Sequence, residues 1–174
     1  MPSKVLIQVA NDFHRRHKLQ EMGIRGGENL EVDSKQVMQH VRKLRDRFVR
    51  GVLGSFEDWR HTHLIQKKAI LKDRNTLDLG DETIVAKKII LAPGSSPIVP
   101  EAWRPYEKYL METDSFFELE DLPKSMAVIG LGVIGIELGQ ALSRLGVQVQ
   151  AFSTNKAIGG LSDPVLQDLS LIHI

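Results

Sequence analysis

The N-terminal third of the chain repeats its apolar residues with the period of an α-helix in two separate stretches. The first stretch predicts a helix over residues 2–21, and Pro2 suits its first turn. Its apolar stripe comprises Val5, Leu6, Val9, Ala10 and Phe13. Asp33, followed three positions later by Gln36, has the pattern of a capping box and predicts the start of a second helix. The buried stripe of that helix is expected to comprise Val37, Val41, Leu44 and Phe48.

Beyond Trp59 the pattern becomes extended, with short runs of β-forming residues separated by turn residues. The runs cover residues 64–71, 76–79, 82–85 and 88–92. They predict a small antiparallel meander that leads into one buried strand over 88–92. Prolines interrupt regular structure from Pro93 onward, and the segment 101–122, rich in proline and aromatic residues, predicts a linker between domains.

A compact strand–helix–strand unit is predicted after Pro123. The first strand is expected over residues 126–130 and the second over 147–152. The helix between them is expected to end at Leu145, where Gly146 closes it.

A G-x-G-x-x-G motif lies between the first of these strands and the helix. Its residues are Gly130, Leu131, Gly132, Val133, Ile134 and Gly135. In this context the motif is typical of a dinucleotide-binding turn. Gly130 would permit the tight turn, Gly132 would let backbone N–H groups approach a pyrophosphate, and Gly135 would let helix and strand pack closely.

Ser153 stands about 20 positions beyond the motif, where an NAD site has an acidic residue that binds the ribose 2′-hydroxyl. A serine can also bond the ribose, but it does not repel a 2′-phosphate as a carboxylate would. Lys156 nearby is a single cation. The sequence therefore leaves the choice between NAD and NADP open.

The amino-acid composition and the charge of the chain argue against several classes of function. The 174 residues include no cysteine, which excludes a disulfide framework and thiol catalysis by this chain alone. No apolar run approaches the roughly 20 residues of a membrane helix, and the N-terminus lacks a signal-peptide pattern, so we expect a cytoplasmic protein with no membrane partner. The net charge of +1, and basic clusters without interleaved aromatic residues, give no indication of nucleic-acid binding. His61 and His63 lack a third ligand, so no metal site is expected.

Several segments together resemble the dihydrolipoamide dehydrogenase family of pyridine nucleotide-disulfide oxidoreductases. They are residues 89–97, residues 122–125 and residues 128–139. The opening Met1-Pro2-Ser3-Lys4 resembles the residues that follow the second cysteine of the family's C-x-x-x-x-C redox motif. The resemblance extends to about Asp168.

The resemblance implies an α/β fold with parts of two domains. Residues 1–100 would be the C-terminal part of a Rossmann-like FAD-binding domain with an antiparallel β-meander. Residues 101–122 would be a linker, and 123–170 the first βαβ part of an NAD(P)-binding Rossmann domain. Residues 171–174 form an unassigned tail.

The resemblance also implies contacts with FAD and with NAD, NADP not being excluded. Lys4 is expected near the flavin and in an ion pair with Glu137. Ala69 stands at the position whose backbone meets the FAD adenine, and Gly94 matches the glycine of the family's A-T-G turn. Pro93 replaces the threonine of that turn and so removes a hydroxyl and a backbone N–H.

By resemblance, the parent protein is an FAD-dependent NAD(P) oxidoreductase acting on a sulfur group, foremost a homodimeric dihydrolipoyl dehydrogenase with a small-molecule dithiol or lipoyl-domain substrate. The family's redox cysteines and its His-Glu acid/base pair are not found here, so we expect an internal fragment with no catalytic residue, inactive and poorly soluble alone. Mercuric, glutathione and coenzyme A disulfide reductase-like proteins share this middle portion. The alternative from another class is a non-catalytic dinucleotide-binding or interaction module.

Overall fold

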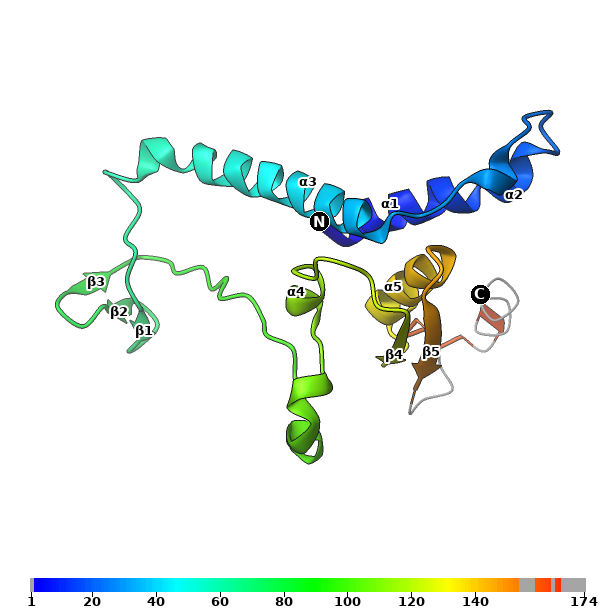
Figure 1. Cartoon of the computed structure of the whole chain (residues 1–174). Coiled ribbons are helices and arrows are strands. Elements are labelled where there is room, and N and C mark those ends of the chain that lie inside the picture. The colour runs from blue at the N-terminus through cyan, green and yellow to red at the C-terminus, as the bar shows by residue number, and fades with distance from the viewer. Residues whose placement is uncertain (1, 154–158, 164, 167–174) are drawn as a thin grey trace. The chain divides into compact units, whose positions relative to one another are not determined.

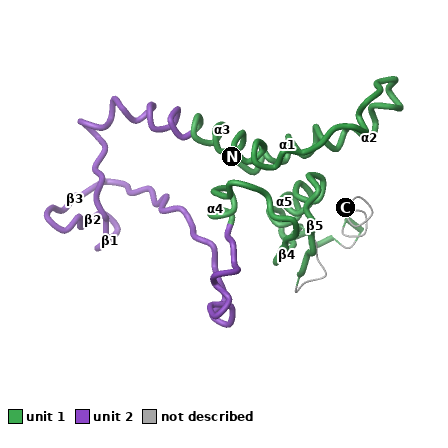
Figure 2. The backbone as a smooth tube through the Cα atoms, in the orientation of Figure 1, with its two compact units in different colours: residues 1–48, 113–174 green, residues 49–112 purple. Residues whose placement is uncertain are grey.

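The structure, a computed structural model, describes residues 2–153, 159–163 and 165–166. The chain forms two compact units, coloured separately in Figure 2. Unit 1 comprises residues 1–48 and 113–174, and unit 2 comprises residues 49–112. The boundary between them falls inside one long helix, α3 (Ser34–Ser55).

Unit 1 begins with α1 (Pro2–His14) and the short α2 (Arg16–Leu19), shown in blue in Figure 1. The helix predicted over 2–21 is thus confirmed for most of its length, with a single turn residue, Arg15, between its two parts. Leu6 and Ala10, in the middle of the predicted stripe, are fully buried. The 3-10 turn η1 (Gly27–Asn29) follows.

The start of α3 is fixed by Asp33, as predicted. The Gln36 backbone N–H donates to Asp33 Oδ1 at 3.0 Å, and Gln36 Nε2 donates to Oδ2 at 2.9 Å. The predicted buried stripe is only partly correct. Val41 is buried together with Met38, one helical turn earlier, whereas Phe48 is 52% exposed. Phe48 is exposed because only the first half of α3 contributes buried residues to the core.

The core of unit 1 joins helices that are far apart in the sequence. It contains Leu6, Ala10, Met38, Val41, Phe116, Phe117, Ala141, Leu142, Leu145 and Val147. Phe116 ends α4 (Thr113–Phe116), and its ring meets that of Phe117 edge to face at 5.0 Å. Polar contacts tie α3 to the chain after α4: Arg42 donates to the Leu119 carbonyl, and Arg45 pairs with Glu118.

The predicted strand–helix–strand unit is confirmed. It consists of β4 (Ser125–Ile129), α5 (Val133–Arg144) and β5 (Gln148–Phe152). The two strands are parallel neighbours. Gly146, at φ +94°, closes α5: its N–H donates to the Ser143 carbonyl, and the Val147 N–H donates to the Leu142 carbonyl. This is a Schellman motif, and the buried Leu142 and Val147 supply its apolar contact.

Unit 2 contains the predicted antiparallel meander. Its strands are β1 (Ile70–Leu71), β2 (Thr76–Asp78) and β3 (Thr83–Val85), with β2 paired to both neighbours. The 3-10 helices η2 (Glu57–Trp59) and η3 (Glu101–Tyr109) flank it in sequence, η3 lying within the predicted linker. This arrangement of a meander and a βαβ unit confirms the predicted fold class.

The strand predicted over residues 88–92 does not form. Ile90 is 92% exposed, and within the described chain no strand pairs with this segment. A strand is stabilised by the ladder it makes with a neighbour, so an apolar run without one stays unpaired. None of residues 49–112, all of which the structure describes, is buried. Unit 2 is therefore held by its strand ladder and polar contacts rather than by a core.

Truncating the core of unit 1 should cost much more stability than truncating its surface. We expect Leu142→Ala, at a site 1% exposed, to lower the free energy of unfolding by about 2–5 kcal/mol, because it leaves a cavity. Met22→Ala, at a site 62% exposed in the same unit, should change it by less than about 0.5 kcal/mol. Urea denaturation of the two variants measures the difference. Equal losses would contradict the assigned core.

The start of α3 should depend on pH. Hydrogen bonds from Gln36, first its backbone N–H, hold the pKa of Asp33 below its ordinary value. A carboxyl whose folded pKa is depressed stabilises the helix fully above its unfolded pKa, and that contribution is lost as pH falls through the folded value. The protection factor of the Gln36 amide hydrogen, which is its intrinsic exchange rate divided by the observed rate, should therefore fall on acidification. Asp33→Asn keeps an acceptor without the charge and should remove this effect; an unchanged pH dependence in Asp33→Asn would contradict the assignment.

Candidate dinucleotide-binding site

The glycine-rich turn connects β4 to α5 and is held against β5. Gly130 has φ +99°, a left-handed conformation that favours glycine. Its N–H donates to the Phe152 carbonyl at 2.8 Å, which extends the β4–β5 ladder to the start of the turn. Gly132 is the N-cap of α5, and its carbonyl accepts the Ile136 N–H at 3.0 Å.

Gly135 brings the first turn of α5 against the end of β4. A Cβ atom added at Gly135 would lie 2.0 Å from the Gly130 carbonyl oxygen and 3.4 Å from Val128 Cγ1. Since real Cβ atoms do not approach backbone oxygen so closely, only glycine fits without displacing the turn. Gly139, one turn further along α5, is less restricted, because its Cβ position lies 3.8 Å from Val128 and from Val149.

Gly132, unlike Gly135, has free space around the position that a Cβ atom would occupy. A Cβ added there would meet no atom within 4 Å. The residues that follow, Val133 and Ile134, are 59% and 60% exposed. Their N–H groups belong to the first turn of a helix, where no intrahelical carbonyl is available to them. The first turn of α5 also holds no acidic residue. The arrangement can therefore accept an anionic group at the positive end of the helix dipole.

The residues after β5 return to the same turn. Ser153 directly follows Phe152 and is exposed. The Gly159 N–H donates to the Leu131 carbonyl at 2.7 Å, so the chain comes back beside the glycine motif. Gly159 was not predicted from the sequence as part of the site. The Gly159-Gly160 pair, in which both residues have positive φ, indicates a turn but not the residues that this turn contacts. Lys156 lies outside the described residues.

The expected ion pair between Lys4 and Glu137 is not formed. Both side chains are exposed, and none of the ion pairs among the described residues joins them. Their helices, α1 and α5, do contact each other, through buried residues and a hydrogen bond from Arg144 to Asn11. Since an exposed pair contributes only about 0–1 kcal/mol, hydration of both groups competes with the contact.

The residues expected on the FAD side, other than Lys4, lie in unit 2. Ala69 is exposed and directly precedes β1. Gly94 has φ +74°, and a Cβ added there would meet no atom within 4 Å, so conformation rather than space requires a glycine. Pro93 and Gly94 lie in a segment without regular secondary structure.

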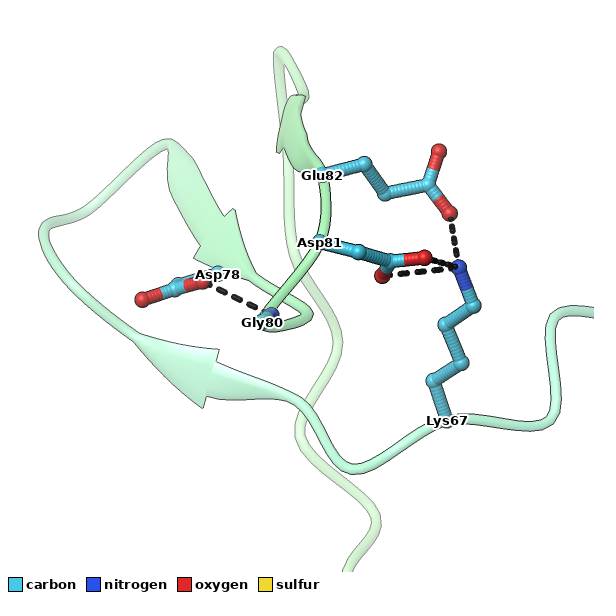
Figure 3. A network of polar contacts seen from close by, with 5 residues as sticks. All are labelled: Lys67, Asp78, Gly80, Asp81 and Glu82. Atoms are coloured by element: carbon cyan, nitrogen blue, oxygen red, sulfur yellow. Dashed lines mark hydrogen bonds and ion pairs between the residues drawn. The ribbon is translucent and has the colours of Figure 1, made fainter.

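A polar network fixes the chain just before Ala69, as Figure 3 shows. Lys67 Nζ donates to both carboxylate oxygens of Asp81, at 2.9 and 2.8 Å, and to Glu82 Oε1 at 2.7 Å. Asp81, and then Glu82, raise the pKa of Lys67, while Lys67 lowers the pKa of Asp81. In the same turn, the Gly80 N–H donates to Asp78 Oδ1. The segment that carries Ala69 is thereby joined to the β2–β3 turn.

The described part of the chain contains no cluster of three or more histidine, cysteine or acidic residues that could hold a metal ion. Nor does it contain a helix of the length and apolarity that a membrane span requires.

The parallel strand–turn–helix unit with its three glycines has the arrangement of a Rossmann-class unit. The family described as pyridine nucleotide-disulphide oxidoreductase matches residues 1–169, and the chain belongs to this family.

Similar proteins agree with that assignment. A dihydrolipoyl dehydrogenase from Geobacillus stearothermophilus is 31% identical over 153 residues, 86% of this chain and 32% of that protein. A glutathione reductase from Nostoc is 33% identical over 116 residues, 66% of this chain and 25% of that protein. The chain thus spans a third or less of the length of these relatives.

The fold has a counterpart among solved structures. A copper(II) complex of the HOCl-induced flavoprotein disulfide reductase RclA from Escherichia coli superposes with a TM-score of 0.75 at 17% sequence identity. The match covers 99% of this chain and 36% of that one. At this identity the likeness concerns the fold alone.

Because Gly135 lies so close to Gly130, replacing it should lower the free energy of unfolding. Gly135→Ala forces a Cβ against the Gly130 carbonyl, and we expect a loss of about 1–3 kcal/mol in the free energy of unfolding. Gly139→Ala is the matched control on the same helix: its Cβ fits, and the better helix former should stabilise by up to about 1 kcal/mol. Urea denaturation compares them. A Gly135→Ala variant as stable as Gly139→Ala would refute the contact.

Proposed function

We propose that the glycine turn binds the pyrophosphate of a nicotinamide dinucleotide within a flavoprotein oxidoreductase that moves electrons between a dithiol or disulfide, FAD and NAD(P). The observation that carries this proposal is the turn itself. Gly135 lies so close to Gly130 that only glycine fits, while the space at Gly132 is open. Gly135 allows α5 to pack closely against β4, and Gly132 leaves room for a ligand.

The residues of the turn fit such a cofactor. The first-turn N–H groups of α5 would hold the pyrophosphate, and no acidic side chain in that turn opposes it. Ser153 would face the adenosine ribose, since it follows the strand that pairs with β4. A bound nicotinamide supplies the hydride-transfer chemistry. The chain's own part is to bind and orient.

The proposed contacts with FAD rest on the resemblance to the family. Ala69 and Gly94 would provide backbone contacts to the flavin cofactor, and Lys4 would lie near its isoalloxazine ring. The Lys67 network supports the first of these contacts, because it holds the segment that precedes β1. For Lys4, the exposed position on α1 leaves its ammonium group available to a cofactor.

We propose that the substrate is a dithiol of the dihydrolipoyl type, either a small molecule or a lipoyl domain. The similarity to a dihydrolipoyl dehydrogenase over 86% of the chain supports it. Glutathione reductase is the second candidate, favoured by a relative of 33% identity over a shorter stretch. A homodimer belongs to the same proposal and rests on the family resemblance.

The test uses the protein as its source organism makes it, and compares it with Gly132→Ala. Alanine is compatible with φ −71° and finds no clash at this position, so folding should be retained. Its methyl group would occupy the approach of the pyrophosphate. We expect affinity for NADH to fall about tenfold or more, a loss of at least about 1.4 kcal/mol in binding free energy. Fluorescence titration measures it, and unchanged affinity would refute the proposed site.

Activity assays then separate the candidate functions. Reduction of NAD by dihydrolipoamide, accompanied by the absorption bands of bound flavin, is the expected result. Faster turnover of oxidised glutathione with NADPH would favour the second candidate. Dinucleotide binding without flavin bands and without turnover of either substrate would instead indicate a non-catalytic binding module.

A further inference from the structure

The end of β5 lies directly beside the first glycine of the turn. Phe152 is the register partner of Ile129, and its carbonyl accepts the Gly130 N–H at 2.8 Å. Ser153 is the next residue along the chain and is exposed. In this type of unit, the residue at the end of the second strand faces the adenosine ribose, where a carboxylate selects NAD by bonding the 2′-hydroxyl and repelling a 2′-phosphate.

No carboxylate replaces the serine in the following residues. The sequence from Ser153 to Ser162 contains no aspartate or glutamate and one lysine. The chain contacts the glycine turn just before this stretch, through the Phe152 carbonyl, and again within it, through the Gly159 N–H, which donates to the Leu131 carbonyl.

The first carboxylate beyond this stretch is already engaged. Asp163 Oδ1 accepts the Val165 N–H at 2.8 Å and the Leu166 N–H at 3.3 Å. This is the pattern of a helix N-cap. Asp163 therefore serves the chain that follows it rather than a ribose beside the glycine turn.

We propose that this site does not exclude a 2′-phosphate and binds NADP(H) no more than about tenfold more weakly than NAD(H), with Ser153 as the residue that sets the specificity. The inference rests on the proposed dinucleotide function. Its physical basis is the missing like-charge repulsion, because a carboxylate placed against a phosphate disfavours binding of the phosphorylated cofactor. The serine hydroxyl can donate to or accept from either a hydroxyl or a phosphate.

The experiment measures dissociation constants for NADH and NADPH at one fixed ionic strength, using the full protein and two variants. Ser153→Asp introduces the missing carboxylate and should weaken NADPH binding about a hundredfold while leaving NADH binding within about tenfold. Ser153→Asn has nearly the same shape without the charge, and should keep the two constants within about tenfold of each other.

The ratio of the two constants in the wild-type protein tests whether the site excludes a 2′-phosphate, and the ratio in Ser153→Asp tests the role of Ser153. Unchanged NADPH binding in Ser153→Asp would overturn that role. In the wild-type protein, NADPH constants equal to, below or up to about tenfold above those for NADH support the inference. A preference for NADH greater than about tenfold overturns it while leaving the proposed function intact. Binding of neither dinucleotide overturns the proposed function, and this inference with it.

Discussion

The close approach of α5 to β4 is the constraint on which the candidate site depends. A side chain at Gly135 would collide with the Gly130 carbonyl at 2.0 Å, so the helix can begin this near the strand only with glycine there. The first turn of α5 therefore begins directly beyond β4, and its N–H groups, like those of any helix N-terminus, have no intrahelical carbonyl partner. Gly130, at φ +99°, turns the chain sharply enough to make the connection. The anion-accepting geometry is thus a consequence of backbone packing.

A buried core stabilises this geometry in unit 1, whereas unit 2 has no buried residues. In unit 1, Leu6 of α1, Val41 of α3 and Leu142 of α5 meet in one core, so helices distant in sequence support the βαβ unit. In unit 2 no residue is buried, and Ile90 and Ile98 are each 92% exposed. The meander there relies on its ladder and on the Lys67 network. Its apolar side chains present surface that other protein or cofactor could cover.

Local patterns were enough to predict the βαβ unit, the Asp33 cap, the Gly146 stop and the meander, because each depends on neighbours in sequence. Features that depend on distant partners were predicted less well. The strand predicted over residues 88–92 finds no pairing strand among the described residues, and Phe48 lies in the half of α3 that contributes no buried residue to the core. The Lys4–Glu137 ion pair was inferred from family resemblance, yet both groups stay exposed. The Gly159 contact with Leu131 was missed, because nothing in the local sequence says where the chain returns.

The central claim is that the first turn of α5 is the place where a dinucleotide pyrophosphate binds. The most direct measurement is the change in backbone amide NMR shifts when NADH is added to the isotopically labelled protein. The account predicts the largest changes at the N–H groups of residues 131–135, with a smaller change at Ser153 and little at α3. Changes centred elsewhere, with residues 131–135 unaffected at saturating NADH, would contradict it.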